Sequence, residues 1–386
     1  MRTIKDIKCH IFNVSAKTNW IFISIEDSSG YKAWGEASIN GWELILKSTL
    51  DYFLDDWIGL SLNEFKDRLN PSSKLPGGLV YNTLISAMTQ ALVSLMAADE
   101  EKSACEIIGS QQRQFIPLYA NINRATLERT PQGFVNTTRK AKELGFSKFK
   151  LAPFDKLMPN LCSTSEGKKF INHGIDCIQA VRDFIGPEDL LMIDCHWRFD
   201  EHTAIKTLND LLPAKLHWFE CPIAENQSNW EATRRIRSAA NENGVLLAAA
   251  ETQVGLDSFQ TIFDEKLYDV VMPDVKYCGG PWEMLKIAEK AYENGVKFSP
   301  HNPSGPICTW HSLQLCLVAP ECEMLEIQFA ETELYDLLQT KSIPICKNGQ
   351  LHQPYSPNDL PDLDLELLDG RPYQRVPPGV ETILNM

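Results

Sequence analysis

The sequence predicts an α/β protein built on a (β/α)8-type barrel, with a smaller α+β domain packed against it. From about residue 115 onward, short β-rich runs alternate with longer stretches of helical spacing, the pattern that parallel strands and their crossovers require. The eight runs span 215 residues, close to the length of a (β/α)8 barrel. An open doubly wound sheet is the alternative, but no strand carries a G-x-G-x-x-G or P-loop sequence.

The predicted barrel strands are FIPLYANI (115–122), KFKLAPF (148–154), LLMIDCHW (190–197), KLHWFECP (215–222), LLAAAET (246–252), DVVMPDVKY (269–277), VKFSPHN (296–302) and MLEIQF (324–329). Residues 1–114 begin with three antiparallel strands and continue with helical segments. The tail after residue 345 is too rich in proline to form a barrel element. We therefore expect a capping domain over 1–114, completed by 345–386, and a catalytic barrel over 115–344.

Composition excludes several classes of function. The net charge is −14 and the isoelectric point is near 5.1, so the chain lacks the basic face that binds nucleic acid. We find no apolar run of membrane-spanning length and no signal-peptide core at the N-terminus. The 11 cysteines never form a C-x-x-C pair, which is typical of reduced thiols. We expect a cytoplasmic protein with no nucleic-acid or membrane partner.

Ionisable residues follow the predicted strands, from the second strand to the eighth. In a barrel of this kind, polar residues at the carboxyl ends of strands face the active site. The residues at these positions are Lys148, Lys150, Asp194, His196, Glu220, Glu251, Asp274, His301 and Glu326.

Three carboxylates, Asp194, Glu220 and Glu251, come from consecutive strands. Carboxylates that converge on one pocket repel one another unless a cation lies between them. Oxygen ligands favour a hard divalent ion, so the three residues predict a Mg²⁺ site. Each carboxylate taken alone could instead be a salt-bridge partner.

Two further pairs could provide acid–base chemistry. Lys148 and Lys150 are two residues apart on one strand and point to the same side, where each could lower the pKa of the other. The alternative is a solvated lysine pair. His196 lies two residues beyond Asp194, and His301 lies near Asp274, whose carboxylate would fix the imidazole tautomer. A lone histidine is otherwise often structural.

These motifs together resemble the enolase superfamily, and within it the mandelate racemase-like branch. The resemblance covers nearly the whole chain and rests on K-F-K, the D…E…E set, P-D-V-K-Y-C-G-G and the His301 segment. D-C-H at 194–196 and P-H-N-P-S-G-P are most similar to galactonate dehydratase and related acid-sugar dehydratases. The resemblance implies an enolase-like modified TIM barrel, Mg²⁺, a small sugar-acid substrate and a homo-oligomer.

The activity implied is dehydration of an acid sugar to a 2-keto-3-deoxy acid through an enediolate. His301, backed by Asp274, would remove the α-proton, and His196 would protonate the leaving hydroxyl. Glu326 would be protonated and would donate a hydrogen bond to the substrate carboxylate. Lys148 and Lys150 would bind the carboxylate or supply a base of opposite stereochemistry. A racemase or epimerase using Lys150 and His301 is one alternative, and a non-catalytic sugar-acid sensor is another.

Three more residues are candidates for substrate binding. Trp20, in the loop at 15–20, could close over the site, or it could be a buried core residue. Asn121 and Arg124 follow the first barrel strand, where Arg124 could bind a second carboxylate or could cap the loop. A monoacid and a diacid substrate therefore both stay open.

Overall fold

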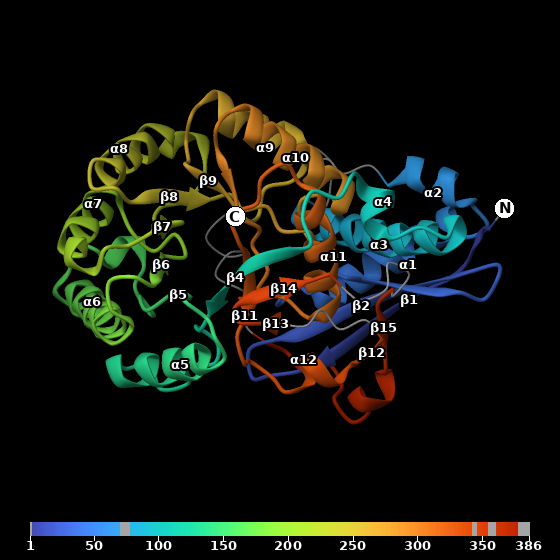
Figure 1. Cartoon of the computed structure of the whole chain (residues 1–386), viewed down its shortest axis with the longest axis horizontal. Coiled ribbons are helices and arrows are strands. Elements are labelled where there is room, and N and C mark those ends of the chain that lie inside the picture. The colour runs from blue at the N-terminus through green and yellow to red at the C-terminus, as the bar shows by residue number, and fades with distance from the viewer. Residues whose placement is uncertain (1, 70–77, 342–345, 354–359, 377–386) are drawn as a thin grey trace.

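The computed structural model of the chain describes residues 2–69, 78–341, 346–353 and 360–376. Its larger part is a ring of parallel strands surrounded by helices, and a smaller part with a three-stranded sheet lies beside the ring (Figure 1). The strands of the ring are β4 (Phe115–Asn121), β5 (Lys148–Leu151), β6 (Leu190–Asp194), β7 (Trp218–Glu220), β8 (Leu246–Ala249), β9 (Val270–Val271), β10 (Lys297–Phe298) and β11 (Leu325–Gln328). All eight predicted strands are therefore present.

Helices connect the strands in the predicted alternation. They are α5 (Pro131–Glu143), α6 (Ser165–Ile185), α7 (Glu201–Asp210), α8 (Trp230–Asn241), α9 (Gly255–Asp264), α10 (Pro281–Glu293) and α11 (Pro306–Val318). After β11 the next helix in the described chain is the short α12 (Leu334–Leu337). The architecture is thus a (β/α) barrel whose last helix is reduced to a single turn.

Backbone hydrogen bonds close the ring. Neighbouring strands from β4 to β10 pair in parallel, and β11 pairs in parallel with β4. Between β10 and β11, the amide of Glu323 donates to the carbonyl of Phe298 (2.9 Å) and the amide of Glu326 donates to that of Pro300 (3.4 Å). Every strand of the ring therefore has a hydrogen-bonded neighbour on each side.

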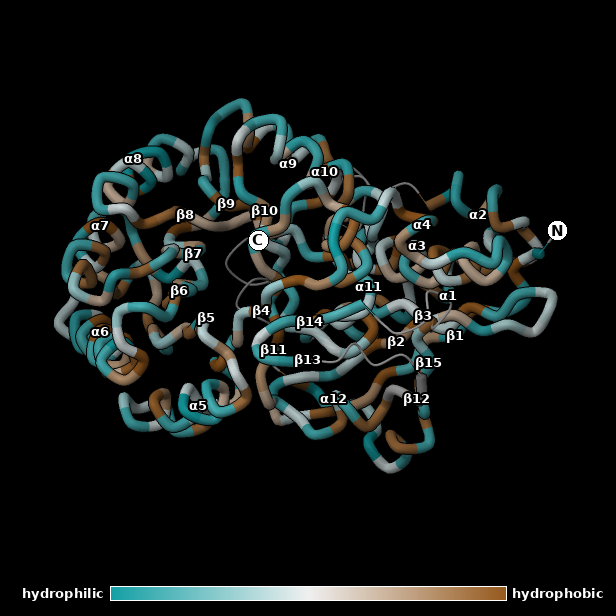
Figure 2. The backbone as a smooth tube through the Cα atoms, viewed as in Figure 1, coloured by the Kyte–Doolittle hydropathy of each residue, from teal (hydrophilic) through white to brown (hydrophobic). Residues whose placement is uncertain are grey.

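Alternation along the strands separates the barrel interior from the layer beneath the helices. Residues such as Phe149 and Phe219 pack outward in a large cluster with the helices. A second cluster fills the interior below the carboxyl ends, and its members are Tyr119, Met192, Trp218, Ala248, Val270, Met272 and Met324. Figure 2 shows hydrophobic colour along β8 and mixed colours along α6 and α8. The apolar interior forms the floor on which the polar strand ends stand.

The N-terminal part is an antiparallel sheet covered by helices. Its strands are β1 (Ile4–Asn13), β2 (Asn19–Asp27) and β3 (Lys32–Glu36), and its helices are α1 (Glu43–Trp57), α2 (Leu62–Arg68), α3 (Gly78–Glu100) and α4 (Ala104–Ile108). The sheet packs closely on α3, since a Cβ added to Gly35 would lie 1.9 Å from the carbonyl oxygen of Ala87.

Helix α3 is more apolar over its length than the sequence analysis predicts for any segment of the chain. By length and composition alone, it is the one helix among the described residues that could cross a membrane. In the structure, 83% of its most apolar window is buried inside the molecule, in the position of a core helix. The sequence expectation overlooked this helix because polar Thr, Gln and Ser residues interrupt its apolar runs.

The tail contacts both parts of the molecule. Strands β13 (Cys346–Lys347) and β14 (Gln350–His352) form a hairpin, and β14 pairs with the start of β4. The tail therefore does contribute to the barrel wall, contrary to the sequence expectation, because the paired residues precede its proline-rich stretch. Strand β12 (Gln339–Lys341), which precedes this hairpin, pairs with β15 (Asp362–Leu363), and Leu363 packs in a cluster with Trp20 and Trp34. The predicted domain boundaries at 114 and 345 stay a prediction.

Hydrogen bonds from the smaller part also fix the position of the loops that follow β9 and β10. The buried carboxylate of Glu36, at the end of β3, accepts hydrogen bonds from the amides of Gly305 (2.8 Å) and Cys308 (3.0 Å) at the start of α11. The dipole of α11 favours a negative charge at this N-terminal end of the helix. The hydroxyl of Ser86 on α3 accepts from the amide of Gly279 (2.9 Å) in the loop after β9. These loops carry two of the predicted catalytic residues.

We predict that Gly35→Ala destabilises the protein by about 3 kcal/mol or more, because the new methyl group overlaps the backbone of α3. Urea unfolding followed by tryptophan fluorescence measures this change. The control is Lys32→Ala, an exposed position on the same strand, with an expected change within about 0.5 kcal/mol. Equal stability of the two variants would contradict the close packing of β3 on α3.

Candidate active site

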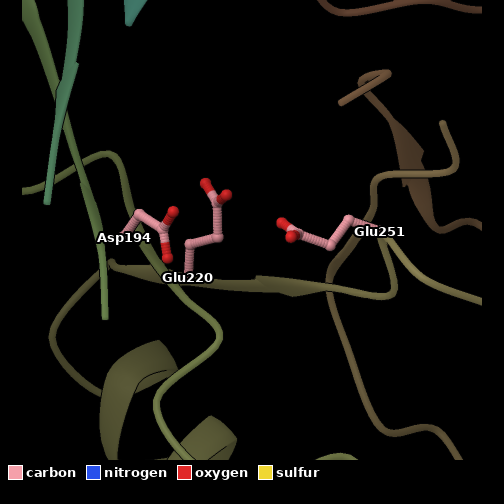
Figure 3. Close-up of side chains that lie close together, drawn as sticks. All are labelled: Asp194, Glu220 and Glu251. Carbon is pink, nitrogen blue, oxygen red and sulfur yellow. The ribbon is translucent and has the colours of Figure 1, made fainter. Parts of the chain in front are cut away.

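Three carboxylates meet at the carboxyl ends of β6, β7 and β8. Asp194 ends β6, Glu220 ends β7 and Glu251 follows β8, and one oxygen from each lies within 4.8 Å of the other two (Figure 3). All three residues are buried. Such a set of oxygen donors fits a hard divalent cation, which would relieve the repulsion between the carboxylates.

The electrostatics of the triad reflect this crowding. Burial raises the pKa of Glu220 to about 8; the charges of Asp194 and Glu326 add to the effect, and Lys150 opposes it. Burial also raises the pKa of Asp194, but the charge and hydrogen bonds of His196 outweigh this effect and lower the pKa to about 2. Burial and the neighbouring carboxylates therefore favour the protonated form of Glu220, and a cation at the centre would oppose this effect.

Lys150 is a fixed cation beside the triad. Its Nζ lies 2.7 Å from Oε1 of Glu220 and 3.0 Å from Oε1 of Glu326, and its side chain is 1% exposed. Burial lowers the pKa of this lysine, but the charges of the two carboxylates raise it by more than burial lowers it, so the pKa lies well above its ordinary value. The predicted lowering of this pKa by a neighbouring lysine is therefore wrong.

Lys148 lies away from the site. It starts β5 opposite Leu190, the first residue of β6, and its charged neighbours are Asp189 and Glu323 at the amino ends of their strands. Two residues along a strand cover about 6.6 Å, so Lys148 is one layer deeper than Lys150 although both point to the same side. The predicted contact of Lys148 with substrate is wrong for this reason.

His301 is held between Asp274 and the triad. Its Nδ1 lies 2.8 Å from Oδ2 of Asp274, and its Nε2 lies 3.4 Å from Oε2 of Glu251. The contact with Asp274 places the proton on Nδ1 and directs the lone pair of Nε2 toward the triad. This is the arrangement that a general base requires.

Lys276 is a site residue that sequence reasoning missed. Its Nζ contacts the Asp274 oxygen that also binds His301, and its amide donates to Oδ1 of Asp274 (2.9 Å). The side chain is buried, and the charge of Asp274 outweighs burial to raise its pKa. Its place two residues after a strand-end aspartate, within the quoted P-D-V-K-Y-C-G-G motif, was the available signal.

His196 contacts the other end of the triad. Its Nε2 lies 2.7 Å from Oδ2 of Asp194, and its amide donates to Oδ1 of the same residue (2.8 Å). Its backbone has a φ of 48°, an uncommon conformation for a residue other than glycine. With 24% of its side chain exposed, His196 is more open to solvent than the triad. The two imidazoles therefore contact different members of the triad, Asp194 and Glu251.

Glu326 differs from its predicted protonation state. Its Oε1 accepts hydrogen bonds from Asn121 Nδ2 (2.6 Å) and Lys150 Nζ, and its Oε2 accepts from the amide of Asn302 (3.0 Å). Burial raises the pKa of Glu326, but Lys150, the charge of His301 and the amide of Asn302 lower it more, so the carboxylate is ionised. The prediction of a protonated Glu326 is wrong, since three donors already surround it. Asn121 lies beside it, at the predicted place.

Trp20 is a core residue. It is buried, and its ring centroid lies 6.0 Å from that of Phe22 and 6.5 Å from that of Tyr335. It lines a cavity of about 490 Å³, together with residues after β11, and the three carboxylates do not line that cavity. The predicted closure of Trp20 over the substrate is therefore wrong, and the alternative of a buried tryptophan holds.

Arg124 lies at the predicted edge but is engaged by the protein. Its Nη1 donates to Oε2 of Glu331 (3.0 Å), to the carbonyl of Pro303 (3.1 Å) and to Oγ1 of Thr18 (3.3 Å). Glu331 was not predicted, because it follows the last strand in a segment without a recognisable motif. The alternative of a loop-capping role for Arg124 thus fits these contacts.

Comparison with known proteins gives the family. Residues 134–357, more than half of the chain, match the enolase C-terminal domain-like family, so the chain belongs to this family. The chain is 24% identical over 326 residues to the D-galactonate dehydratase of Variovorax paradoxus, a match covering 84% of this chain and 81% of that protein. It is 23% identical over 361 residues to the D-xylonate dehydratase of Haloferax volcanii, covering 91% and 85%.

Solved structures agree on the fold. A candidate L-alanine-DL-glutamate epimerase from Burkholderia xenovorans, bound to magnesium and fumarate, has a TM-score of 0.86 at 20% identity and covers 99% of this chain and 98% of its own. A candidate galactarate dehydratase from Agrobacterium radiobacter, bound to Na and L-malate, has a TM-score of 0.82 at 20% identity, covering 98% and 97%. The predicted fold class and the resemblance to the enolase superfamily, with its mandelate racemase-like and acid-sugar dehydratase members, are confirmed.

We predict that Mg²⁺ affinity rises with pH by about tenfold per unit between pH 6 and 8, because Glu220 must lose a proton to bind the ion. The raised pKa also means that, without metal, stability falls as pH rises from about 4.5 toward 8, since the folded state holds the proton more tightly. Calorimetric titration with Mg²⁺ in buffers of different ionisation heat counts the released proton.

Glu220→Gln is expected to abolish this binding, while Glu225→Gln, a control just beyond the same strand, retains it. An affinity independent of pH over this range would contradict the assigned protonation of the triad.

We predict that Lys276→Met destabilises the protein by about 3 kcal/mol, because it removes one partner of a buried ion pair. Urea unfolding measures this loss. In the control Lys286→Met, the exposed pair with Glu283 is broken, with an expected loss below about 1 kcal/mol. A loss that small for Lys276→Met would show that Asp274 does not depend on this lysine.

Proposed function

We propose that the protein is a Mg²⁺-dependent hydro-lyase that dehydrates an acid sugar to a 2-keto-3-deoxy acid. The observation that carries the proposal is the pair of imidazoles, His301 and His196, which contact different members of the carboxylate triad. Elimination of water needs one group that accepts the α-proton and another that protonates the departing hydroxyl. The names of the two dehydratase relatives support an acid sugar as the substrate class.

His301 takes the role of base. Its Nε2 accepts the proton from the carbon next to the substrate carboxylate, and Asp274 stabilises the imidazolium that results. Lys276 and the amide of residue 276 keep Asp274 in place. General base catalysis typically contributes about 10²–10⁴-fold, so the negative charge that develops on the substrate must also be stabilised.

That charge develops on the substrate carboxylate as it becomes an enediolate. Asp194, Glu220 and Glu251 would hold a divalent cation, which would supply positive charge at this point. Lys150 provides a second, fixed positive charge, held in position by Glu220 and Glu326. Because these groups are buried, their electrostatic effect is stronger than it would be in water.

His196 completes the elimination. It donates a proton to the hydroxyl on the β-carbon, so that the C–O bond breaks, water leaves and a C=C bond forms. The enol product then tautomerises to the 2-keto-3-deoxy acid. The greater exposure of His196 suits the release of water.

Proton transfer without elimination is less well supported. A racemase or epimerase needs a second base opposite His301, and the predicted candidate was Lys150. An ammonium group held by two carboxylates, with a raised pKa, is a poor base. A sugar-acid sensor would not need the complete set of two histidines and three carboxylates, so this set favours an enzyme.

The test is a screen of acid sugars with the purified protein and Mg²⁺, in which semicarbazide detects the 2-keto product. We expect product that disappears with EDTA and a decrease of about 10²-fold or more in kcat for His301→Asn. His202→Asn is the matched control, an exposed histidine on α7 with expected normal activity.

The same reactions run in D₂O and read by NMR separate the two proton steps. For His196→Asn we expect deuterium at the α-carbon with little keto product, because the proton is removed but the hydroxyl is not released. Deuterium uptake without keto product in the unmodified protein would instead assign a racemase or epimerase. Binding of acid sugars with neither signal would assign a sensor.

A further inference from the structure

Arg124 is a cation at the edge of the barrel where the strand ends carry the site residues. It lies three residues beyond the end of β4, and its Nη1 binds the carbonyl of Pro303, two residues beyond His301. Its contact with Thr18 joins the barrel to the loop before β2. A free arginine here would bind the second carboxylate of a diacid in a bidentate manner.

Glu331 already takes that place. Its Oε2 lies 3.0 Å from Nη1 of Arg124, while its Oε1 accepts hydrogen bonds from Ser15 Oγ (2.8 Å) and from Thr18 Oγ1. Its side chain is 7% exposed. A carboxylate so enclosed is not displaced without leaving a buried charge unpaired. Glu331 is thus a carboxylate of the protein itself that already occupies Arg124.

Four other cations at this edge also have acceptors from the protein. Lys150 and Lys276 bind the carboxylates of the site, and Arg129 binds Asp155. Nη1 of Arg198 donates to a main-chain carbonyl (2.7 Å). Lys17 is exposed, and a solvated ammonium on a flexible stem offers no bidentate site.

We propose that Glu331 makes the site selective for monoacid sugars, whose far end carries a hydroxyl group, over the corresponding diacids. This inference rests on the proposed function. A second carboxylate near Arg124 would face the negative charge of Glu331, whereas a hydroxyl group brings no charge. The two relatives named for D-galactonate and D-xylonate, both monoacids, agree with this direction.

The experiment compares acids of matched configuration: D-galactonate with galactarate, D-gluconate with D-glucarate and D-xylonate with xylarate. We expect kcat/KM for the best monoacid to exceed that of its diacid by at least about tenfold. For Glu331→Gln, which frees Arg124, we expect KM for the diacid to fall by about tenfold or more, with a smaller change for the monoacid. The double variant Glu331→Gln/Arg124→Ala is expected to lose the gain.

Glu265→Gln is the matched control. It also removes the carboxylate partner of an arginine, Arg234, but on the outer helices, and both kinetic constants are expected to stay unchanged. Circular dichroism verifies that each variant is folded. If Glu331→Gln does not fold, the ratio measured for the unmodified protein still decides the question.

A diacid turned over as well as its monoacid, or better, would overturn the selectivity while leaving the dehydratase proposal intact. If no acid sugar is turned over, the proposed function fails, and calorimetric binding in the presence of Mg²⁺ then tests the selectivity. Tighter binding of diacids in that assay would overturn it, and tighter binding of monoacids would support it.

Discussion

Repulsion between three buried carboxylates is the constraint on which the rest of the site depends. One oxygen each of Asp194, Glu220 and Glu251 lies within 4.8 Å of the other two, and burial together with the charges of Asp194 and Glu326 raises the pKa of Glu220. Positively charged and polar groups around the triad offset its negative charge. Lys150 is shared by Glu220 and Glu326, and each histidine contacts one member of the triad. This arrangement of oxygen donors fits a divalent cation at the centre.

The smaller part of the molecule helps to hold this arrangement. Glu36 binds the start of α11, and Ser86 binds the loop after β9, so β3 and α3 restrain the segments that carry His301 and Asp274. The absence of a side chain at Gly35 lets the sheet that ends in Glu36 pack closely on α3. Positioning of the base therefore depends on packing far from the barrel strands.

The barrel and the triad could be predicted because strand alternation and strand ends are local features of a sequence. Alternation along a strand, however, shows only which face a side chain is on and not how far along the barrel axis it lies. For this reason the sequence predicts Lys148 at the site, although it lies one layer below Lys150. The protonation of Glu326 depends on donors from three separate segments, and the pair of Arg124 and Glu331 joins residues 207 positions apart. Such long-range contacts leave no pattern in a single sequence. Lys276 is different, since its place in P-D-V-K-Y-C-G-G, two residues after Asp274, is visible in the sequence.

The most direct test of the account is a crystal structure of the protein with Mg²⁺ and a sugar acid. The account predicts one ion bound by an oxygen of Asp194, Glu220 and Glu251, at about 2.1 Å from each, with the α-carbon of the ligand facing Nε2 of His301. An ion bound elsewhere, or a ligand whose α-carbon faces away from His301, would contradict it.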